Sequence, residues 1–373
     1  YGLVGSEMCI RDRDRVQADV RLSFGQVTAG LRKTAALLAL AVMFTGCSAP
    51  AESESGAALP DVVGSMDIRY AEQFSVDYLA DGSALAEVAD GRRYLIIPDG
   101  GEVPEHLPED VTVISQPENI YLASSSSMDL FSSLDCLGDI LASSTPESGW
   151  KLPEIAQAMA DEDILYAGKY SSPDIELLMS EGCDLAIENM MIYHSPKTAE
   201  QIESCGIPVF IERSSAESHP LGRLEWVRLY GLMLGKSDEA EKFFSEKCSL
   251  LDEVTSREST GCTAAFFYIS SNGSAVVRKP GDYISKMIEL AGGKYVFTAG
   301  DLNVDENALS SANIQFEAFY ALAKDADCLI YNGTVDGGVD TLAQLTAKNP
   351  LLADFRAVQT GNVWCTNATV FQQ

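Results

Sequence analysis

Polar, aromatic and basic side chains follow several short apolar segments, where strands are predicted to end. Arginine pairs with carboxylate or catecholate oxygens, and aromatic rings stack on flat or apolar faces. Such residues suit recognition of a small molecule with anionic oxygens. The candidates are Lys169, Tyr170 and Ser171; Tyr193 and His194; Arg213 and Ser214; Tyr268, Ser270 and Asn272; and Arg278. We expect Arg213 and Arg278 to contribute most, because each follows or closes a predicted strand.

Catalytic and metal motifs are missing from the sequence. It contains no G-x-G-x-x-G, no G-x-x-x-x-G-K-[ST] and no G-x-S-x-G. None of its three histidines has a partner at metal-ligand spacing, and its nine cysteines include no C-x-x-C. We therefore predict a binding protein that is not an enzyme and carries no cofactor. Ligation of haem iron by Tyr193 or His194 is an alternative, because both residue types can hold haem.

The segment from Ile164 to Phe210 indicates how these side chains are positioned. An apolar start leads into a loop, and a helix is expected from Pro173 to Gly182. A strand at 184–187, a helix at 197–204 and a strand at 207–210 follow. Alternating strands and helices at this spacing predict βαβ units and a parallel sheet. Ligands of such sheets bind at the carboxyl ends of the strands, where the candidate residues lie.

Other segments extend this α/β pattern along the chain. Residues 66–98 read as a β-meander with a hairpin at Asp90-Gly91, and residues 111–116 and 119–124 as strands. Residues 128–138 are predicted to be helical, and residues 220–256 to form two helices separated at Gly235. Beyond them, the pattern predicts strands at 263–269, 327–331 and 362–364 and helices at 283–291, 316–323 and 349–356.

One stretch of the sequence resembles the motif of a known family. AGKYSSPDIELLMSEGCDLAI, followed after a helix by GIPV, resembles solute-binding proteins of ABC importers for iron–siderophore, haem and cobalamin. The resemblance implies two Rossmann-like α/β lobes with central parallel sheets, joined by a long bridging helix. It places an N-terminal lobe at 63–218, the helical segment at 219–258 and a C-terminal lobe at 259–373. It also adds Ser125 and Ser126, which precede a helix expected to face the cleft.

The function implied by the resemblance is capture of a ferric-siderophore-like complex between the lobes of a monomer. The complex is then delivered to an ABC permease dimer with its ATPase. Family members carry one acidic residue on each lobe for docking onto permease arginines, and Glu176 and Glu317 occupy matching places. Alternatives are haem or cobalamin as the ligand, and a surface sensor or adhesion module on the same fold. A cleft hydrolase lacks a recognisable nucleophile–base pair.

The two ends of the chain have their own signatures. Residues 1–13 resemble the translation of a sequencing adapter, and residues 14–46 include a basic start and a short apolar run typical of a signal peptide. Cys47 then resembles a bacterial lipidation site, with residues 47–62 as a tether, so we expect an extracytoplasmic protein lipid-anchored to the cell membrane. At the other end, family members usually continue with a closing helix, and we expect the chain to be cut short.

Composition excludes one class of partner. The formal net charge is −29, which argues against nucleic acid, whose binding requires a basic surface. Besides Cys9 and Cys47, seven cysteines remain, an odd number in mostly apolar contexts, and we expect them to serve as small core residues.

Overall fold

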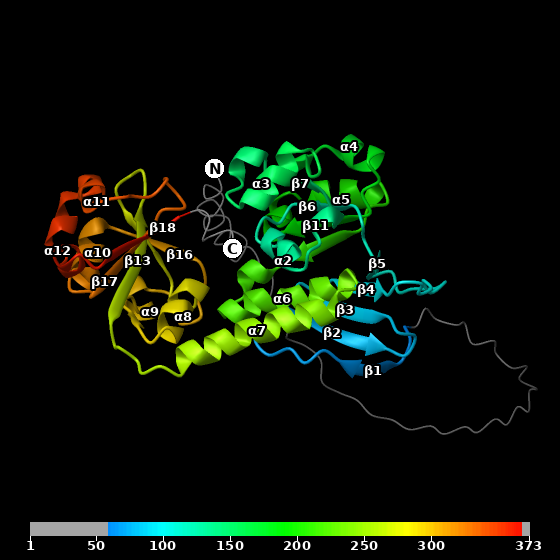
Figure 1. Ribbon diagram of the computed structural model, residues 1–373, viewed down its shortest axis with the longest axis horizontal. Coiled ribbons are helices and arrows are strands. Elements are labelled where there is room, and N and C mark those ends of the chain that lie inside the picture. Colours follow the sequence, from blue (N-terminus) through cyan, green and yellow to red (C-terminus); the bar gives the residue numbers. More distant parts are fainter. Residues whose placement is uncertain (1–58, 368–373) are drawn as a thin grey trace, which may run out of the picture. The chain divides into compact units, whose positions relative to one another are not determined.

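The computed structural model describes residues 59–367, so the signal region and Cys47 lie outside the described residues. We call residues 59–218 the N-lobe and residues 259–367 the C-lobe. The chain enters the N-lobe through a five-stranded sheet with the order β1-β2-β3-β4-β5 (Figure 1). Its strands are β1 (Val62–Ser65), β2 (Phe74–Leu79), β3 (Ala84–Val88), β4 (Arg93–Ile97) and β5 (Val111–Ser115). The predicted hairpin is confirmed: β3 and β4 pair in antiparallel fashion, and Gly91 between them has a φ of 88°.

The second N-lobe sheet is parallel throughout, with the order β12-β11-β6-β7-β8. Its strands are β6 (Ile120–Leu122), β7 (Ile140–Ser143), β8 (Leu165–Tyr166), β11 (Leu185–Asn189) and β12 (Val209–Glu212). The accompanying helices are α2 (Met128–Ser133), α3 (Pro153–Ala160), α4 (Ile175–Ser180) and α5 (Pro196–Ser204). Short 3₁₀ turns are η1 (Leu137–Asp139), η2 (Glu147–Gly149), η3 (Met190–His194) and η4 (Ser214–Ala216), and β9 (Gly168–Lys169) pairs with β10 (Ser172–Pro173).

Two predicted helix boundaries in this lobe are wrong. Pro173 does not open a helix, because it lies in β10; α4 begins after Asp174, whose carboxylate accepts a hydrogen bond from the Leu177 N–H at 3.0 Å. The helix expected to reach Gly138 ends at Ser133, and Asp135 has a left-handed φ of 58° that a helix cannot accommodate.

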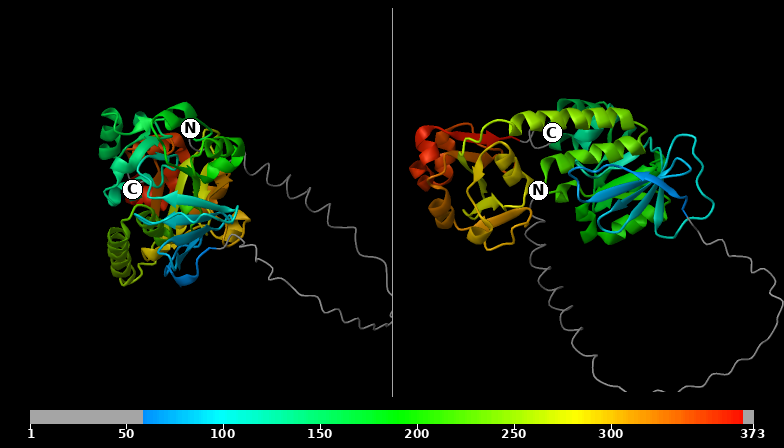
Figure 2. Two further views of the ribbon diagram at one scale, coloured as in Figure 1. Left: turned by 90° about the vertical axis from the view of Figure 1, so that its right-hand side faces the viewer. Right: turned by 90° about the horizontal axis from the view of Figure 1, so that it is seen from below.

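Two consecutive helices follow the N-lobe, α6 (Pro220–Met233) and α7 (Ser237–Thr255) (Figure 2). Pro220 occupies the first helical position of α6, where proline loses no helical hydrogen bond. Gly235 separates the helices with a φ of 66°, as expected from the sequence. At 19 residues, α7 is the longest helix of the described chain and would be roughly 28 Å in length.

Buried carboxylates fasten α6 to the N-lobe. Glu225, fully buried, accepts hydrogen bonds from the backbone N–H groups of Arg69 (2.9 Å), Tyr70 (2.7 Å) and Ala71 (2.8 Å). Gly222 faces the same segment, where an added Cβ would lie 2.8 Å from the Tyr70 carbonyl oxygen. The predicted meander is therefore wrong at residues 69–71, because their N–H groups bond to a carboxylate of α6 instead of to a neighbouring strand.

A second carboxylate, in the segment just before α6, repeats this arrangement. Glu217 accepts hydrogen bonds from the N–H groups of Glu72 (2.7 Å) and Gln73 (3.0 Å), and from Trp226 Nε1 at 3.0 Å. Trp226 is fully buried and packs edge-on against Phe74. Burial raises the pKa of Glu217, while its three donors act in the opposite direction.

The C-lobe contains a mixed sheet with the order β16-β14-β13-β17-β18, and β15 also pairs with β13. The strands are β13 (Thr263–Ile269), β14 (Ala275–Arg278), β15 (Lys294–Tyr295), β16 (Ser311–Ile314), β17 (Cys328–Asn332) and β18 (Val363–Thr366). The helices are α8 (Tyr283–Leu290), α9 (Ala299–Leu302), α10 (Phe316–Ala323), α11 (Leu342–Lys348) and α12 (Arg356–Thr360), with a 3₁₀ turn η5 (Pro350–Asp354). β13, β17 and β18 run parallel, whereas β14 is antiparallel to both of its neighbours, β13 and β16.

The C-lobe core is aromatic. Phe319 is fully buried and lies 4.5 Å from Phe267 and 5.4 Å from Phe355 between ring centroids. The single helix predicted over 349–356 is wrong: Pro350 starts a 3₁₀ turn that ends at Asp354, and α12 begins only at Arg356. These observations together give an α/β fold of two lobes with central sheets, as predicted. Within residues 59–367, no helix is both long and apolar enough to cross a membrane.

Candidate functional site

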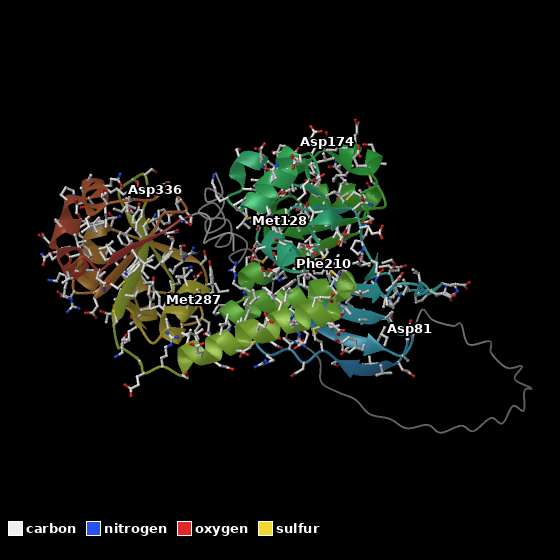
Figure 3. The ribbon with its side chains drawn as sticks, viewed as in Figure 1. Asp81, Met128, Asp174, Phe210, Met287 and Asp336 are labelled. Carbon is white, nitrogen blue, oxygen red and sulfur yellow. The ribbon has the colours of Figure 1, made fainter. Side chains whose placement is uncertain are left out.

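A pocket of about 480 Å³ is lined by residues of α2, α6 and the C-lobe. Its C-lobe wall is apolar and includes Phe266, Tyr283, Ile284, Met287, Ile288 and Ile330. Met287 projects from α8 (Figure 3) and is 48% exposed, so this wall has apolar surface available to a ligand. A concave, mostly apolar site with a few polar groups is the usual form of a small-molecule site.

The N-lobe side of the pocket is more polar. Ser126 and Ser214 line it, and both bond to the buried carboxylate of Glu212 at the end of β12. Glu212 Oε2 accepts from Ser124 Oγ at 2.8 Å and from Ser126 Oγ at 3.4 Å, and Oε1 accepts from the Ser214 N–H at 2.5 Å. The fully buried Glu212 therefore orients two polar groups that face the pocket.

Charged groups at the pocket are few. Of the lysines and arginines in the described chain, only Arg223 of α6 lines it, and its guanidinium lies 4.1 Å from the ring centroid of Tyr283 in α8. The only carboxylate among the lining residues is Asp129 of α2. Burial raises the pKa of Asp129, and the neighbouring Glu154 adds to the effect.

A second hollow of about 390 Å³ lies beside α11 and is lined by Gly338, Val339 and Lys348, among others. All of its lining residues come from one short stretch of the C-lobe. It therefore lacks the enclosure by separate elements that the first pocket has, and we do not regard it as the ligand site.

Arg213, predicted to bind an anionic group, is held within the N-lobe. Its Nε and Nη2 both donate to Gln73 Oε1 at 3.1 Å, and Nη1 donates to the Tyr193 hydroxyl at 3.1 Å. Tyr193 in turn donates to Asp90 Oδ2 at 2.6 Å. Neither Arg213 nor Tyr193 is among the residues that line the pocket, and their role in binding stays a prediction.

Arg278 lies next to the pocket but is also engaged. Its Nη1 is 3.6 Å from Asp282 Oδ2, and its guanidinium is 5.8 Å from the ring centroid of Phe266, which lines the pocket. Burial raises the pKa of Asp282, and the positive charge of Arg278 opposes this shift. Arg278 is therefore paired with a carboxylate in the described structure.

The remaining candidates from the sequence lie outside the pocket lining. Ser270 and Asn272 close the turn between β13 and β14, where Ser270 Oγ donates to Asn272 Oδ1 at 2.6 Å. The others, likewise outside the lining, are Ser125, Lys169, Tyr170, Ser171, His194 and Tyr268. Of the predicted ligand-binding residues, the pocket therefore brings together only Ser126 and Ser214.

Glu176 and Glu317 occupy equivalent places in the two lobes. Each is the second residue of its helix, α4 and α10, and each is exposed. Neither lines the pocket. This position suits contact with another protein, although docking itself stays a prediction.

No motif or spacing in the sequence pointed to Arg223, Asp129, Tyr283 or Glu212. Arg223 lies in a helix, not in a strand-end loop, and the others resemble ordinary residues of a chain with 55 acidic side chains. The helical spacing from Pro220 onward could have placed Arg223 near the lobe junction, but it could not show which face of α6 it occupies. Within residues 59–367, no cluster of three or more His, Cys, Asp or Glu could hold a metal ion.

The chain is similar to known binding proteins and lipoproteins. A family model described as periplasmic binding protein matches residues 128–369. An uncharacterized lipoprotein of Methanocaldococcus jannaschii is 25% identical over 303 residues, which cover 76% of this chain and 69% of that protein.

Solved structures show the same fold at low identity. A periplasmic haem-binding protein of Vibrio cholerae has a TM-score of 0.56 at 15% identity, covering 68% of this chain and 90% of its own. A petrobactin-binding protein of Bacillus subtilis has a TM-score of 0.57 at 13% identity, and the match covers 78% of this chain and 91% of that protein. A periplasmic binding protein of Veillonella parvula has a TM-score of 0.57 at 19% identity, and the match covers 72% of this chain and 90% of that protein.

Proposed function

This chain belongs to the periplasmic binding protein family, and from that premise we propose that it is the extracytoplasmic solute-binding component of an ABC importer. The observation that carries the proposal is the pocket lined by α2, α6 and the C-lobe. Binding there requires no chemistry beyond enclosure of a ligand by two lobes, with small closure because helices join them. The ligand is then passed to a permease dimer with its ATPase.

The proposed ligand is a metal chelate with a substantial apolar surface, and a ferric-siderophore-like complex is the first choice. Support comes from relatives of this fold whose names specify haem or petrobactin. Haem and cobalamin are the alternatives of the same class, and the apolar C-lobe wall suits their flat or bulky surfaces. A sensor or adhesion module using the same fold remains the alternative outside transport.

Anchoring through Cys47 is also part of the proposal. Cys47 closes a short apolar run behind Arg32 and Lys33, and the relative from Methanocaldococcus jannaschii is named as a lipoprotein. A lipid on this residue would hold the chain at the membrane surface. Labelling with a fatty-acid probe should mark the wild-type chain, and equal labelling of Cys47→Ser would disprove the anchor.

Native mass spectrometry tests the ligand class. The protein is purified from its own source, and its mass is compared before and after mild unfolding. We expect one small molecule per chain, released on unfolding and carrying iron or a corrin. An Ala291→Trp variant, which places a large ring among the lining residues, should lose it. Retention of the same molecule by this variant would remove the pocket from the proposal.

Uptake into reconstituted vesicles tests delivery separately from capture. Exchanging Glu176 and Glu317 for lysine places like charges opposite the expected permease arginines and should abolish uptake while ligand affinity stays unchanged. The control exchanges Glu105 and Glu306, also exposed and one on each lobe, which changes net charge equally. If both double variants transport alike, the docking role of Glu176 and Glu317 is wrong. If the first loses affinity, those carboxylates serve binding or folding instead.

A further inference from the structure

Arg223 is unusual among the arginines around the pocket. It is half-buried on α6, lines the pocket, and contacts the ring of Tyr283 at 4.1 Å from guanidinium carbon to centroid. Within residues 59–367, no side chain or backbone carbonyl accepts a hydrogen bond from its guanidinium, and no carboxylate lies within ion-pair distance of that group. The two other arginines near the lobe junction, Arg213 and Arg278, are both engaged with protein groups.

The contact with Tyr283 leaves the hydrogen-bonding capacity of Arg223 intact. A guanidinium stacks through its flat face, whereas its five N–H donors lie in the plane of the group. Stacking on Tyr283 therefore fixes the orientation of Arg223 without using a donor. Arginine held in this way is prepared to bind a carboxylate or a similar oxyanion with two parallel hydrogen bonds.

The surrounding charges leave Arg223 uncompensated. The positive charge of Arg223 acts on Asp282, where it opposes the effect of burial on the pKa, but the ion pair of Asp282 is with Arg278. Asp129 faces the pocket from α2, and burial raises its pKa. Most remaining lining residues are apolar. A partly desolvated positive charge in such surroundings gains more from an anionic ligand group than it would at an exposed site.

We propose that Arg223, held by Tyr283, binds an acidic group of the ligand while the apolar C-lobe wall covers the rest. The ligand is then amphipathic, with one acidic end such as a carboxylate or sulfonate and an extended apolar body. This inference rests on the proposed function, because it assigns a ligand contact within the same pocket. In this proposal Arg213 and Arg278 keep their contacts with other protein side chains.

Two dyes with the same aromatic skeleton test this assignment: anilinonaphthalene sulfonate, which is anionic, and N-phenylnaphthylamine, which is uncharged. Each is titrated by fluorescence against the wild-type chain and against Arg223→Met. We expect the variant to bind the anionic dye about tenfold or more weakly, since a charged hydrogen bond is lost. The uncharged dye should bind both proteins within about twofold, because the apolar wall is unchanged.

Further variants make the result specific. Arg223→Lys keeps the charge but not the fork of donors, and should retain part of the affinity for the anionic dye. Arg257→Met is the matched control, because Arg257 is exposed on the surface and paired with Glu253 at 2.9 Å; it should bind both dyes like the wild type.

Equal loss of both dyes in Arg223→Met, or no loss of the anionic dye, would overturn the inference while leaving the pocket in place. Failure of the wild-type chain to bind either dye would count against the pocket itself, and therefore against the proposed function.

Discussion

On its N-lobe side, α6 carries the buried carboxylate of Glu225, which accepts three backbone hydrogen bonds, whereas on its C-lobe side it presents Arg223 and Leu224 to an apolar wall. In the first contact a buried carboxylate accepts hydrogen bonds from backbone N–H groups, and such charge-assisted bonds away from water hold α6 firmly against the N-lobe. The second has a single cation–π contact and space for a ligand. From this difference we predict that α6 stays with the N-lobe when a ligand binds and that the C-lobe adjusts around the ligand.

The largest effect is expected from Glu225→Leu, which tests the attachment of α6 to the N-lobe. It leaves three backbone N–H groups without their acceptor and removes one of the partners of Arg228, whose Nη1 is 3.0 Å from Glu225 Oε1. We expect a loss of about 3–5 kcal/mol in the free energy of unfolding. Urea unfolding followed by tryptophan fluorescence, to which the buried Trp150 and Trp226 both contribute, measures it.

Glu241→Leu is the matched control for that change. Glu241 also pairs with Arg228, at 2.8 Å, but its side chain is 52% exposed. We expect a loss below about 1 kcal/mol, as for other surface pairs. Equal losses in the two variants would mean that burial of the carboxylate adds nothing to the attachment of α6.

Glu188 sharpens the comparison because it is buried without donors. In the described residues neither of its carboxylate oxygens has a hydrogen-bond partner, and the neighbouring Tyr121 hydroxyl also has none. Burial raises the pKa of Glu188 to about 8. The folded state therefore holds this proton more tightly than the unfolded state, so the contribution of Glu188 to stability is most favourable at acidic pH and falls as pH rises toward 8.

We expect Glu188 to cost the wild-type protein about 3 kcal/mol between roughly pH 5 and pH 7.5. Glu188→Gln cannot ionise, so its unfolding free energy should fall less over the same range. Parallel urea titrations at both pH values give the difference between the two slopes. Identical slopes would show that Glu188 reaches solvent or a donor that keeps it charged.

The smallest expected effect concerns the other side of α6. Tyr283→Leu removes the ring under Arg223, and we expect a loss of at most about 1 kcal/mol in unfolding free energy. Tyr283→Phe keeps the ring face and should match the wild type. A loss as large as that of Glu225→Leu would reverse the comparison, because the C-lobe would then be attached as firmly as the N-lobe.

The sequence was sufficient for the regular parts of the fold. The apolar spacing of α6 and α7 and the glycine between them, the Asp90-Gly91 hairpin, and the alternating strands and helices from β11 to β12 are local patterns. They could be predicted because hydrophobic periodicity and turn-forming residues determine structure within a few residues of the chain.

The site was less predictable because it depends on long-range burial. Glu212, Glu217 and Glu225 look like surface carboxylates in a chain of net charge −29, and only the fold shows that donors from distant segments reach them. For the same reason Arg213, which follows a strand as expected, is engaged with Gln73, which is 140 residues earlier in the chain. Arg223 could be recognised only after the face of α6 was known.

The free cysteines have a practical consequence for measuring the adjustment of the lobes. Of the seven in the described chain, Cys205 of the N-lobe and Cys365 of the C-lobe are exposed, Cys262 and Cys328 are partly exposed, and the rest are buried. Among these seven cysteines, maleimide chemistry should therefore reach Cys205 and Cys365 first, which provides one reporter site on each lobe without adding a thiol. Spin labels or a fluorophore pair at these two native positions would then report the separation of the lobes directly, with and without ligand.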